Sequence, residues 1–234
     1  MTTKKYVIIA AAGYGSRMES NVPKQFMLLA GIPVIVHTIL SFLKVWTDAE
    51  FIVVLPDDEL IRWEKIRKKF LRKNKIQAVS GGATRFHSVK NGLKQVKETG
   101  MVAVHDACRP FVNETLLSRC LETVAEKGNA IPVVDIKDSI REVLKDGSRH
   151  RNRSRFKSVQ TPQCFETAVL KNAYRQTFSE TFTDDASVVE ADGVKIHIIE
   201  GDSRNFKITT PFDLILAENI ILNGKHPGHS NHDV

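Results

Sequence analysis

Short runs of β-branched and other apolar residues alternate with longer amphipathic segments through the first half of the chain. The apolar runs predict buried strands at 6–11, 51–55, 76–79, 101–105 and 130–134. The segments between them predict helices at 34–42, 58–72, 84–96 and 113–127. Because the strands lack polar alternation, they fit a mostly parallel sheet covered by helices on both faces, an α/β fold. Ligands are then expected at the carboxyl ends of strands, in the loops after residues 11, 80 and 105.

Residues 135–160 break this pattern. They alternate polar and apolar residues around Asp146-Gly147, a dipeptide typical of hairpin turns. Basic residues occupy every second position from Arg149 to Lys157, so a strand there would carry all five on one face. A lone hairpin is only marginally stable in water, so we expect it to contact the domain or another subunit.

The remaining third of the chain predicts helices at 166–178 and 211–222 and a strand at 194–199. We expect one domain over residues 1–234, with residues 135–160 as an arm and 224–234 as a disordered tail. A composition of 42% hydrophobic and 26% charged residues excludes disordered and fibrous classes. Three cysteines without CxxC spacing disfavour a disulfide framework or a zinc site, and no apolar run is long enough for a membrane helix. We therefore expect a cytoplasmic protein.

The formal net charge of +7 first suggests nucleic acid or an anionic membrane as a partner. It is concentrated in residues 60–75, with a net charge of +7, and in residues 141–157, with +5, so the rest of the chain carries −5. We interpret the first cluster as the solvated face of a helix whose Trp63, Ile66 and Phe70 face the core. The second is a better candidate for contact with a ligand.

A glycine turn follows the first predicted strand, in the sequence Ala11-Ala12-Gly13-Tyr14-Gly15-Ser16-Arg17. Small residues let the backbone approach a ligand, and its amide N–H groups can bind phosphate oxygens. Met18 excludes the dinucleotide fingerprint, and no Gly-Lys-Ser/Thr follows, which excludes a P-loop. The two cations after the turn, Arg17 and Lys24, suit a transferring phosphoryl group. The alternative is a tight turn with exposed basic residues.

The segment His105-Asp106-Ala107-Cys108-Arg109 ends the strand expected at the centre of the sheet. Asp106 is the candidate ligand for Mg²⁺, which takes one or two carboxylates together with phosphate oxygens. The alternative for Asp106 is a cap on the following helix. We interpret His105 as a partly buried histidine with both nitrogens bonded, and Cys108 as a small core or pocket residue.

Weaker motifs lie elsewhere. Gly81-Gly82 could contact a base or ribose, with Ser88 as a hydrogen-bond donor, although such pairs are often only turns. Arg153 of the hairpin and Lys207 near the last helix could hold a second phosphate group. For the hairpin, the alternative is a solvated basic face.

Together these elements carry a resemblance. In order, AAAGYGSRM…PKQF, GGATRFHSV, HDACRPF, TPQCF, FTDDAS and GDSRNFKITTPFDL are similar to the 2-C-methyl-D-erythritol 4-phosphate cytidylyltransferase family over residues 5–222. The resemblance implies a Rossmann-like, three-layer α/β domain with a protruding β-arm that mediates a homodimer. It also implies CTP as co-substrate, Mg²⁺ as cofactor and a place in non-mevalonate isoprenoid biosynthesis.

The resemblance also assigns residues. It implies catalytic roles for Arg17, Lys24, Arg153 and Lys207. The implied nucleotide-binding residues are Ala11, Ala12, Gly13, Gly15, Gly81, Gly82, Ser88 and Ala107. The implied substrate-binding residues are Asp106, Arg109, Ser139, Arg153 and Lys207, with Asp106 also binding the metal. The chain departs from the family pattern at Ser139, commonly Thr, at Ala10, often Pro, and at Cys108, often Ala; none removes a charged group.

The reaction implied is attack by the sugar-alcohol phosphate on the α-phosphorus of CTP, with release of pyrophosphate. Two alternatives remain open from the sequence. One is a cytidylyltransferase of the same superfamily that acts on ribitol 5-phosphate. The other is a non-catalytic nucleic-acid-binding protein that uses residues 60–75 and the arginine hairpin, with steeply salt-dependent binding.

Overall fold

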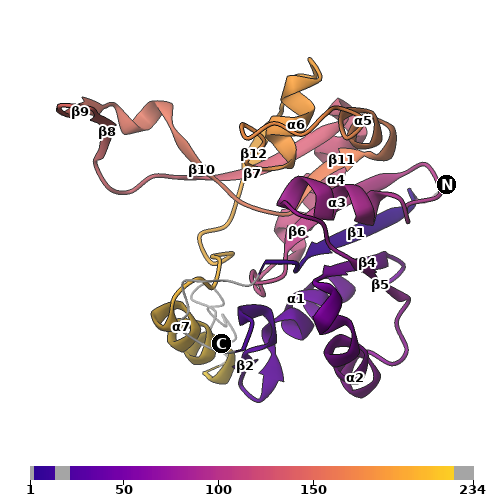
Figure 1. Cartoon of the computed structure of the whole chain (residues 1–234). Coiled ribbons are helices and arrows are strands. Elements are labelled where there is room, and N and C mark those ends of the chain that lie inside the picture. Colours follow the sequence, from indigo (N-terminus) through magenta and orange to yellow (C-terminus); the bar gives the residue numbers. More distant parts are fainter. Residues whose placement is uncertain (1–2, 14–21, 224–234) are drawn as a thin grey trace, which may run out of the picture.

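The computed structural model describes residues 3–13 and 22–223. Within them, a central sheet of eight strands runs in the order β10-β7-β11-β6-β1-β4-β5, with β12 paired to β7 (Figure 1). The strands are β1 (Lys5–Ala10), β4 (Glu50–Leu55), β5 (Ile76–Ser80), β6 (Met101–Asp106), β7 (Asn129–Asp135), β10 (Lys157–Val159), β11 (Gln163–Glu166) and β12 (Ile198–Glu200). β1 pairs in parallel with β4 and β6, whereas β11 runs antiparallel between β6 and β7. The sheet is therefore mixed but mostly parallel.

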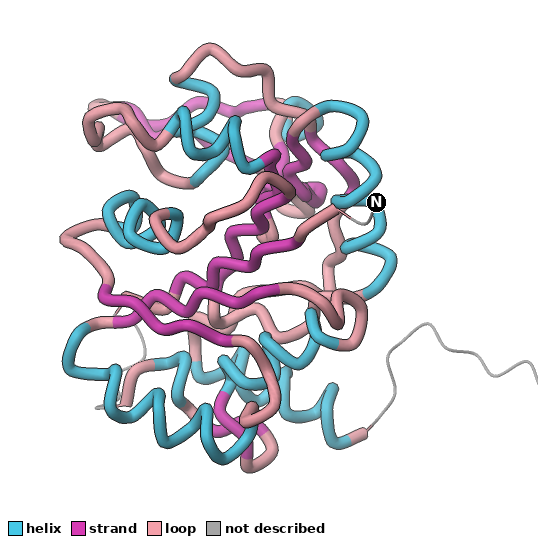
Figure 2. The backbone as a smooth tube through the Cα atoms, turned by 90° about the vertical axis from the view of Figure 1, so that its right-hand side faces the viewer, coloured by secondary structure: helices cyan, strands magenta, loops and turns pink. Residues whose placement is uncertain are grey.

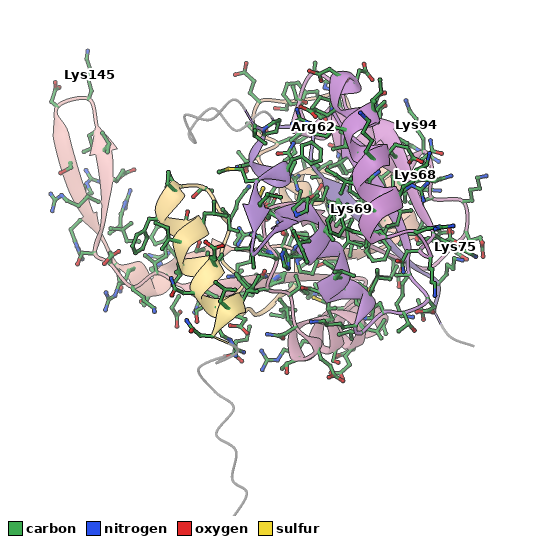
Figure 3. The ribbon with its side chains drawn as sticks, turned by 90° about the horizontal axis from the view of Figure 1, so that it is seen from below. Arg62, Lys68, Lys69, Lys75, Lys94 and Lys145 are labelled. Carbon is green, nitrogen blue, oxygen red and sulfur yellow. The ribbon has the colours of Figure 1, made fainter. Side chains whose placement is uncertain are left out.

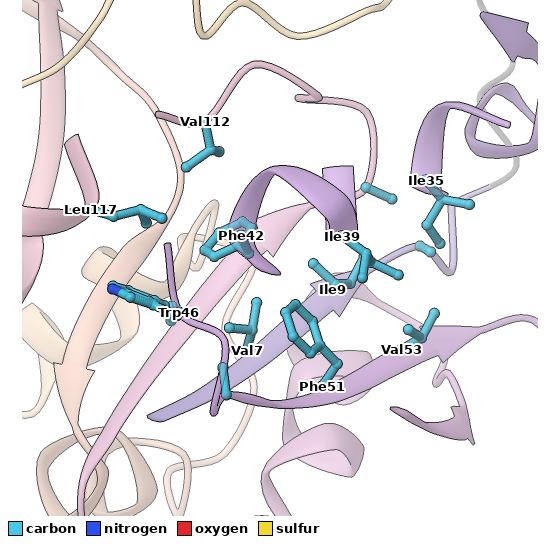
Figure 4. Close-up of a cluster of buried hydrophobic side chains, with 14 of the residues drawn as sticks. Val7, Ile9, Ile35, Ile39, Phe42, Trp46, Phe51, Val53, Val112 and Leu117 are labelled. Carbon is cyan, nitrogen blue, oxygen red and sulfur yellow. The ribbon is translucent and has the colours of Figure 1, made fainter. Parts of the chain in front are cut away.

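Helices cover both faces of the twisted sheet (Figure 2). One apolar cluster includes side chains of α1 (Val34–Leu43), α2 (Leu60–Phe70) and α4 (Glu114–Lys127), and the other includes α3 (Arg85–Leu93), α5 (Thr167–Ala173) and α6 (Asp185–Ala191). Successive residues of β1 point to opposite faces, so Val7 and Ile9 join the first cluster and Tyr6 and Ile8 the second. Figure 4 shows Phe42 and Trp46 lying over the strands in the first cluster.

The strand order reverses at β1. β4 and β5 extend the sheet to one side of β1, and β6 lies on the other, with Ala10 in register with Asp106. Open α/β sheets bind ligands outside the carboxyl ends of strands at such a switch point. The fold therefore places the loops after β1 and β6 beside each other, at the position expected for a site.

The five predicted strands of the first half and the four predicted helices are confirmed, with ends shifted by three residues or fewer. Trp63 is buried, and Ile66 and Phe70 pack against the same cluster, as expected for α2. In the second half, the helix predicted at 166–178 ends at Ala173, and the strand predicted at 194–199 is found at Ile198–Glu200. β11 and α6 were not predicted, nor were the short strands β2 (Leu28–Leu29) and β3 (Ile32–Pro33). The tail 224–234 lies outside the described residues.

The hairpin is confirmed, but two details of the prediction are wrong. β8 (Ile140–Leu144) pairs with β9 (Gly147–Arg151), and Leu144 is opposite Gly147, so the turn residues are Lys145-Asp146. The alternating basic residues do not share one face, because β9 ends at Arg151 and a 3₁₀ turn (Arg153–Arg155) interrupts the strand before β10. Asn152 stabilises this turn by accepting a hydrogen bond from the backbone N–H of Ser154 at 3.1 Å.

The hairpin forms a two-stranded sheet of its own and extends away from the rest of the molecule (Figure 1). Figure 3 shows Lys145 at its tip, on the opposite side of the molecule from Arg62, Lys68 and Lys69 of α2. The two basic clusters of the sequence are therefore separate surfaces. None of the described helices is long and apolar enough to cross a membrane.

Candidate active site

The loop after β1 is held by its neighbours on both sides. The backbone N–H of Ala11 donates to the carbonyl of Val54 at 2.9 Å, and the buried Gln25 side chain donates from Nε2 to the carbonyl of Ala11 at 2.9 Å. Gln25 belongs to the 3₁₀ helix η2 (Lys24–Phe26), which also carries Lys24. The chain therefore returns to its own first loop and brings Lys24 to it. Gly15 and Arg17 lie outside the described residues.

The glycine pair packs directly against that loop. A Cβ on Gly81 would lie 2.6 Å from Cβ of Ala12, so only glycine allows this approach. The N–H of Gly82 donates to Oγ of Ser88 at 3.0 Å, and this hydroxyl donates to the carbonyl of Thr84 at 2.9 Å. Ser88 therefore stabilises the glycine turn as well as lining the adjacent cavity.

Asp106 ends β6 and lies between two cations. Its Oδ2 is 3.1 Å from Nζ of Lys207 and 3.1 Å from Nε of Arg109, and its side chain is only 13% exposed. Burial by itself would raise the pKa of Asp106, but attraction to Lys207, Arg109 and Arg85 outweighs burial and holds the pKa well below its ordinary value. The carboxylate is therefore ionised in the folded protein. The alternative role for Asp106, a cap on the next helix, is wrong, because Asn113 caps α4.

His105 is held in the core by hydrogen bonds at both ring nitrogens. Its ring is fully buried, its Nε2 donates to the carbonyl of Arg109 at 3.0 Å, and its Nδ1 lies 3.0 Å from the hydroxyl of Thr161. Burial lowers the pKa of His105 to about 4, so the ring is neutral at physiological pH. Cys108 is also buried, and burial raises the pKa of its thiol to about 12. Both interpretations from the sequence are confirmed, with His105 more deeply buried than expected.

These loops enclose a cavity of about 290 Å³ at the switch point. Its described lining includes the predicted residues Ala11, Ala12, Gly13, Lys24, Gly82, Ser88, Asp106, Ala107 and Lys207. Lys207 also lines a larger adjoining cavity of about 870 Å³, together with Arg109. The structure thus gathers most of the predicted nucleotide site, and Lys207 stands between the two cavities.

Arg85 is a cavity residue that the sequence did not single out. Its Nη2 lies 2.6 Å from Oδ2 of the fully buried Asp185, whose Oδ1 accepts a hydrogen bond from the hydroxyl of Tyr174 at 2.6 Å. Burial would lower the pKa of Arg85, but the charge of Asp185 raises it above its ordinary value. The neighbouring Asp184 caps α6 instead. The two adjacent acids of the FTDDAS motif could bind a charged side chain, but nothing in the sequence between residues 85 and 185 indicated that Arg85 is the partner.

Two predicted substrate residues lie apart from the cavity within one chain. Arg153 is exposed at the base of the arm, where Nη1 donates to the carbonyl of Lys137. Ser139 is exposed in the segment between β7 and β8. Neither lines the 290 Å³ cavity. A single chain therefore does not bring Arg153 and Lys207 together.

Comparison with known proteins identifies the family. Residues 5–223 match the family model described as 2-C-methyl-D-erythritol 4-phosphate cytidylyltransferase (IspD). The chain belongs to this family. It is 45% identical over 218 residues to the 2-C-methyl-D-erythritol 4-phosphate cytidylyltransferase of Bacteroides thetaiotaomicron, covering 93% of this chain and 100% of that protein. A second cytidylyltransferase of this family, from Bacteroides fragilis, is 44% identical over 92% of this chain and 98% of its own length.

Solved structures of the family agree with the fold. The crystal structure of the cytidylyltransferase from Thermus thermophilus is similar with a TM-score of 0.75 at 32% identity, over 94% of this chain and 98% of that one. The 4-diphosphocytidyl-2C-methyl-D-erythritol synthase from Anaerococcus prevotii has a TM-score of 0.79 at 27% identity, over 94% of this chain and 96% of that one. The cytidylyltransferase family consists of nucleotidyltransferases, so the chain is an enzyme of the transferase class.

Proposed function

We propose that this enzyme transfers the cytidylyl group of CTP to the phosphate of 2-C-methyl-D-erythritol 4-phosphate, forming 4-diphosphocytidyl-2-C-methyl-D-erythritol and pyrophosphate in non-mevalonate isoprenoid biosynthesis. The family, and the names of its relatives, support this substrate over ribitol 5-phosphate. The observation that carries the proposal is the ionised Asp106 held between Lys207 and Arg109 at the β1/β6 switch point, in one cavity with Lys24.

CTP would occupy the 290 Å³ cavity. The backbone of Ala11, Ala12 and Gly13 follows a strand end and faces this space, as expected for a triphosphate-binding loop. Gly82 and Ser88, which line the same cavity, would contact the cytidine. Ala107, also in the lining, would contact the nucleotide. Gly81 does not line the cavity, and its role would be the close packing against Ala12.

The reaction needs no nucleophile from the protein. An oxygen of the substrate phosphate forms a bond to the α-phosphorus of CTP while the bond to the bridging oxygen of pyrophosphate breaks in line. The buried thiol of Cys108 supports this scheme, since its raised pKa leaves it protonated. The residues of the chain would position the two substrates and neutralise their charge.

Lys24 and Lys207 divide that work. Of these two cavities, Lys24 lines the nucleotide cavity and not the larger one, so it would offset charge on the α-phosphoryl group and the departing pyrophosphate, with Arg17 as its proposed neighbour. Lys207 lines both cavities, so it would hold the attacking phosphate at their junction, beside Arg109. This placement supports an in-line arrangement, because the two phosphate groups would meet at Lys207.

Asp106 fits a divalent cation such as Mg²⁺. Both ion pairs that the described residues make with Asp106 involve Oδ2, which leaves Oδ1 for a metal. The described part of the chain has no group of three or more ligating side chains, so phosphate oxygens and water would complete the coordination. When bound, the metal would neutralise charge on the triphosphate.

The arm would complete the site in a homodimer. Among the strands of the described residues, β8 and β9 pair only with each other, and the arm exposes Val143 and Phe156, with Val143 86% exposed. An isolated two-stranded sheet of this kind needs a further surface for stability. A partner subunit would supply that surface and receive Ser139 and Arg153 beside its own Lys207 and Arg109.

The proposal also includes two expectations from the sequence, that residues 1–234 form a single domain and that the enzyme is cytoplasmic.

Pyrophosphate release with CTP and Mg²⁺ tests the function. The assay compares 2-C-methyl-D-erythritol 4-phosphate with ribitol 5-phosphate and other polyol phosphates at equal concentration. We expect release with the methylerythritol phosphate alone, and none when either CTP or the metal is omitted. Preference for ribitol 5-phosphate would contradict the proposed substrate, and release without any polyol phosphate would contradict the proposed reaction.

A further inference from the structure

The segment that carries Lys207 has no helix or strand of its own between β12 and α7 (Pro211–Leu222). It nevertheless places Nζ of Lys207 3.1 Å from Oδ2 of Asp106, at the junction of the two cavities. A flexible side chain on an irregular segment keeps such a position only when the backbone beneath it is fixed. The contacts that fix this backbone are therefore part of the site.

Several bonds hold this backbone, among them those from the N–H of Gly201 to the carbonyl of Val133 at 2.8 Å and from the N–H of Ile208 to the carbonyl of Cys108 at 2.9 Å. The side-chain amide of Gln160 adds three more from a single residue. Its Oε1 accepts from the N–H of Asp202 at 3.1 Å, and its Nε2 donates to the carbonyls of Asp202 at 2.9 Å and Asn205 at 3.3 Å. Gln160 is only 4% exposed, so water would not readily replace a lost bond. Its own N–H donates to the carbonyl of Pro132 in β7 at 2.8 Å. Gln160 thus connects the sheet to the segment of Lys207.

Gly201 leaves room for this amide. A Cβ at Gly201 would lie 2.5 Å from Oε1 of Gln160 and 3.0 Å from the carbonyl of Val133. The first distance is shorter than a Cβ atom tolerates, so the Gln160 amide would have to shift. The second is tighter than most Cβ contacts and involves backbone, which moves less easily than a side chain. The glycine therefore permits the close approach through which Gln160 holds the segment.

We propose that Gln160 is a positioning residue for the transfer reaction, which fixes residues 201–207 so that Lys207 reaches the attacking phosphate. The proposal rests on the role proposed above for Lys207. Gln160 lines the 870 Å³ cavity, but it is only 4% exposed and its amide is engaged by the backbone at both its oxygen and its nitrogen. In this proposal it therefore acts through Lys207, and the double mutant below distinguishes this role from direct contact with the substrate.

Gln160→Met tests the proposal, because it keeps the length of the side chain and removes its hydrogen bonds. We expect kcat to fall by about 100-fold, the scale of a reacting group displaced by about 1 Å, with a higher KM for the sugar phosphate and an unchanged KM for CTP. The matched control is Gln176→Met. The Gln176 amide also joins two backbone carbonyls, those of Ala173 and Val188 at 2.9 Å each, but outside both cavities, so its loss should leave the kinetics unchanged.

A double mutant separates positioning from general stability. In a Lys207→Ala background, Gln160→Met should cause no further loss of kcat, because the cation that it positions is absent. An equal fold-loss in both backgrounds, or wild-type kinetics for a folded Gln160→Met protein, would overturn the proposal. Wild-type kinetics for Lys207→Ala alone would instead overturn the role of Lys207. If Gln160→Met does not fold, Gly201→Ala, which crowds the same amide, is measured in its place. It should likewise lower kcat in the wild-type background and cause no further loss in the Lys207→Ala background. An equal loss in both backgrounds, or wild-type kinetics, would overturn the proposal.

Discussion

Nζ of Lys207 lies 3.1 Å from Oδ2 of Asp106, so the segment before the last helix closes directly on the end of the central strand β6. Nε of Arg109 approaches the same oxygen at 3.1 Å. One carboxylate oxygen therefore holds two cations close together that would otherwise repel each other. The charge of Asp106 is needed for this arrangement whether or not a metal is bound.

We expect Asp106→Asn to lower kcat by about 100-fold or more, since it removes the charge that binds two cations and the proposed metal. Steady-state kinetics with both substrates at a series of Mg²⁺ concentrations measures the effect. Asp192→Asn is a suitable control, because Asp192 bonds the side chain of Asn172 and lines neither cavity. Wild-type turnover in the Asp106 variant would remove this carboxylate from the site.

Lys24→Ala should lower kcat far more than it weakens CTP binding. Lys24 faces the nucleotide cavity, and the proposed charge that it offsets increases as the bond to pyrophosphate breaks. We expect a loss in kcat of about 100-fold with a change in CTP affinity below about tenfold. Calorimetric titration with CTP and single-turnover kinetics separate the two quantities. Lys44→Ala, an exposed lysine at the end of α1, should behave as the wild type; a loss of CTP binding with unchanged kcat would contradict the assigned role.

Arg153 should act on the site of the partner subunit, and mixed dimers can test this. Lys24→Ala and Arg153→Ala proteins are mixed under conditions that exchange subunits and are assayed at a sugar-phosphate concentration at which each variant alone has low activity. If the arm acts across the dimer, each mixed dimer contains one intact site, and random exchange restores about one quarter of wild-type activity. Arg153→Ala alone should mainly raise the KM for the sugar phosphate.

Two results would contradict this arrangement. Activity that stays at the level of the separate variants after verified subunit exchange would place Arg153 in the site of its own chain. A sedimentation experiment that finds only monomers at assay concentration would exclude the dimer. Lys145→Ala, at the exposed tip of the arm, serves as the control (Figure 3). This variant should have wild-type activity by itself, before any subunit exchange.

The sequence predicted the part of the fold that depends on local pattern. β6 is an apolar run ending in His105-Asp106, so both the strand and the position of its carboxylate followed from the residues. β11 was not predicted, because four residues without alternation become a strand only through pairing with β6 and β7. The 3₁₀ turn that interrupts the basic strand is held by local bonds, among them those from the N–H and hydroxyl of Ser154 to Oδ1 of Asn152, which residue spacing does not show.

The candidate site also has a part that the sequence predicted and a part that it did not. Lys24, Asp106 and Lys207 could be assigned from motif order and family resemblance, and they do meet at the described cavity. Arg85 and Gln160 could not, because each acts through a partner far away in the sequence: Asp185 for Arg85, and the Asp202 backbone for Gln160. Charged and glycine-rich motifs therefore indicated most of the groups that line the cavity, whereas residues whose contacts lie far away in the sequence needed the tertiary structure.

The pH dependence of stability should reveal the cap of α7, which follows the Lys207 segment. Oδ2 of Asp213 accepts from the N–H and hydroxyl of Thr209 at 2.9 Å each and from the N–H of Thr210 at 2.8 Å. Burial alone would raise the pKa of Asp213, but these hydrogen bonds lower it below its ordinary value of 3.8. As the pH falls, the unfolded chain binds the proton first. The stabilisation is therefore complete above about pH 5 and is lost below about pH 4.

We expect Asp213→Ala to lower the free energy of unfolding at about pH 7 by about 1 kcal/mol, the usual value of a helix cap. Urea unfolding followed by circular dichroism at a series of pH values measures this difference, which should be constant from about pH 8 to 5 and shrink in more acidic buffer. Thr210→Ala is the matched control, because it removes the other half of the capping box, the bond from the N–H of Asp213 to Oγ1 of Thr210 at 3.2 Å, without removing a titrating group. Its effect should vary less with pH than that of Asp213→Ala, because the bonds from Thr209 and from the backbone of Thr210 still lower the pKa of Asp213. An Asp213→Ala difference that is independent of pH would mean that the cap does not depend on the charge of this carboxylate.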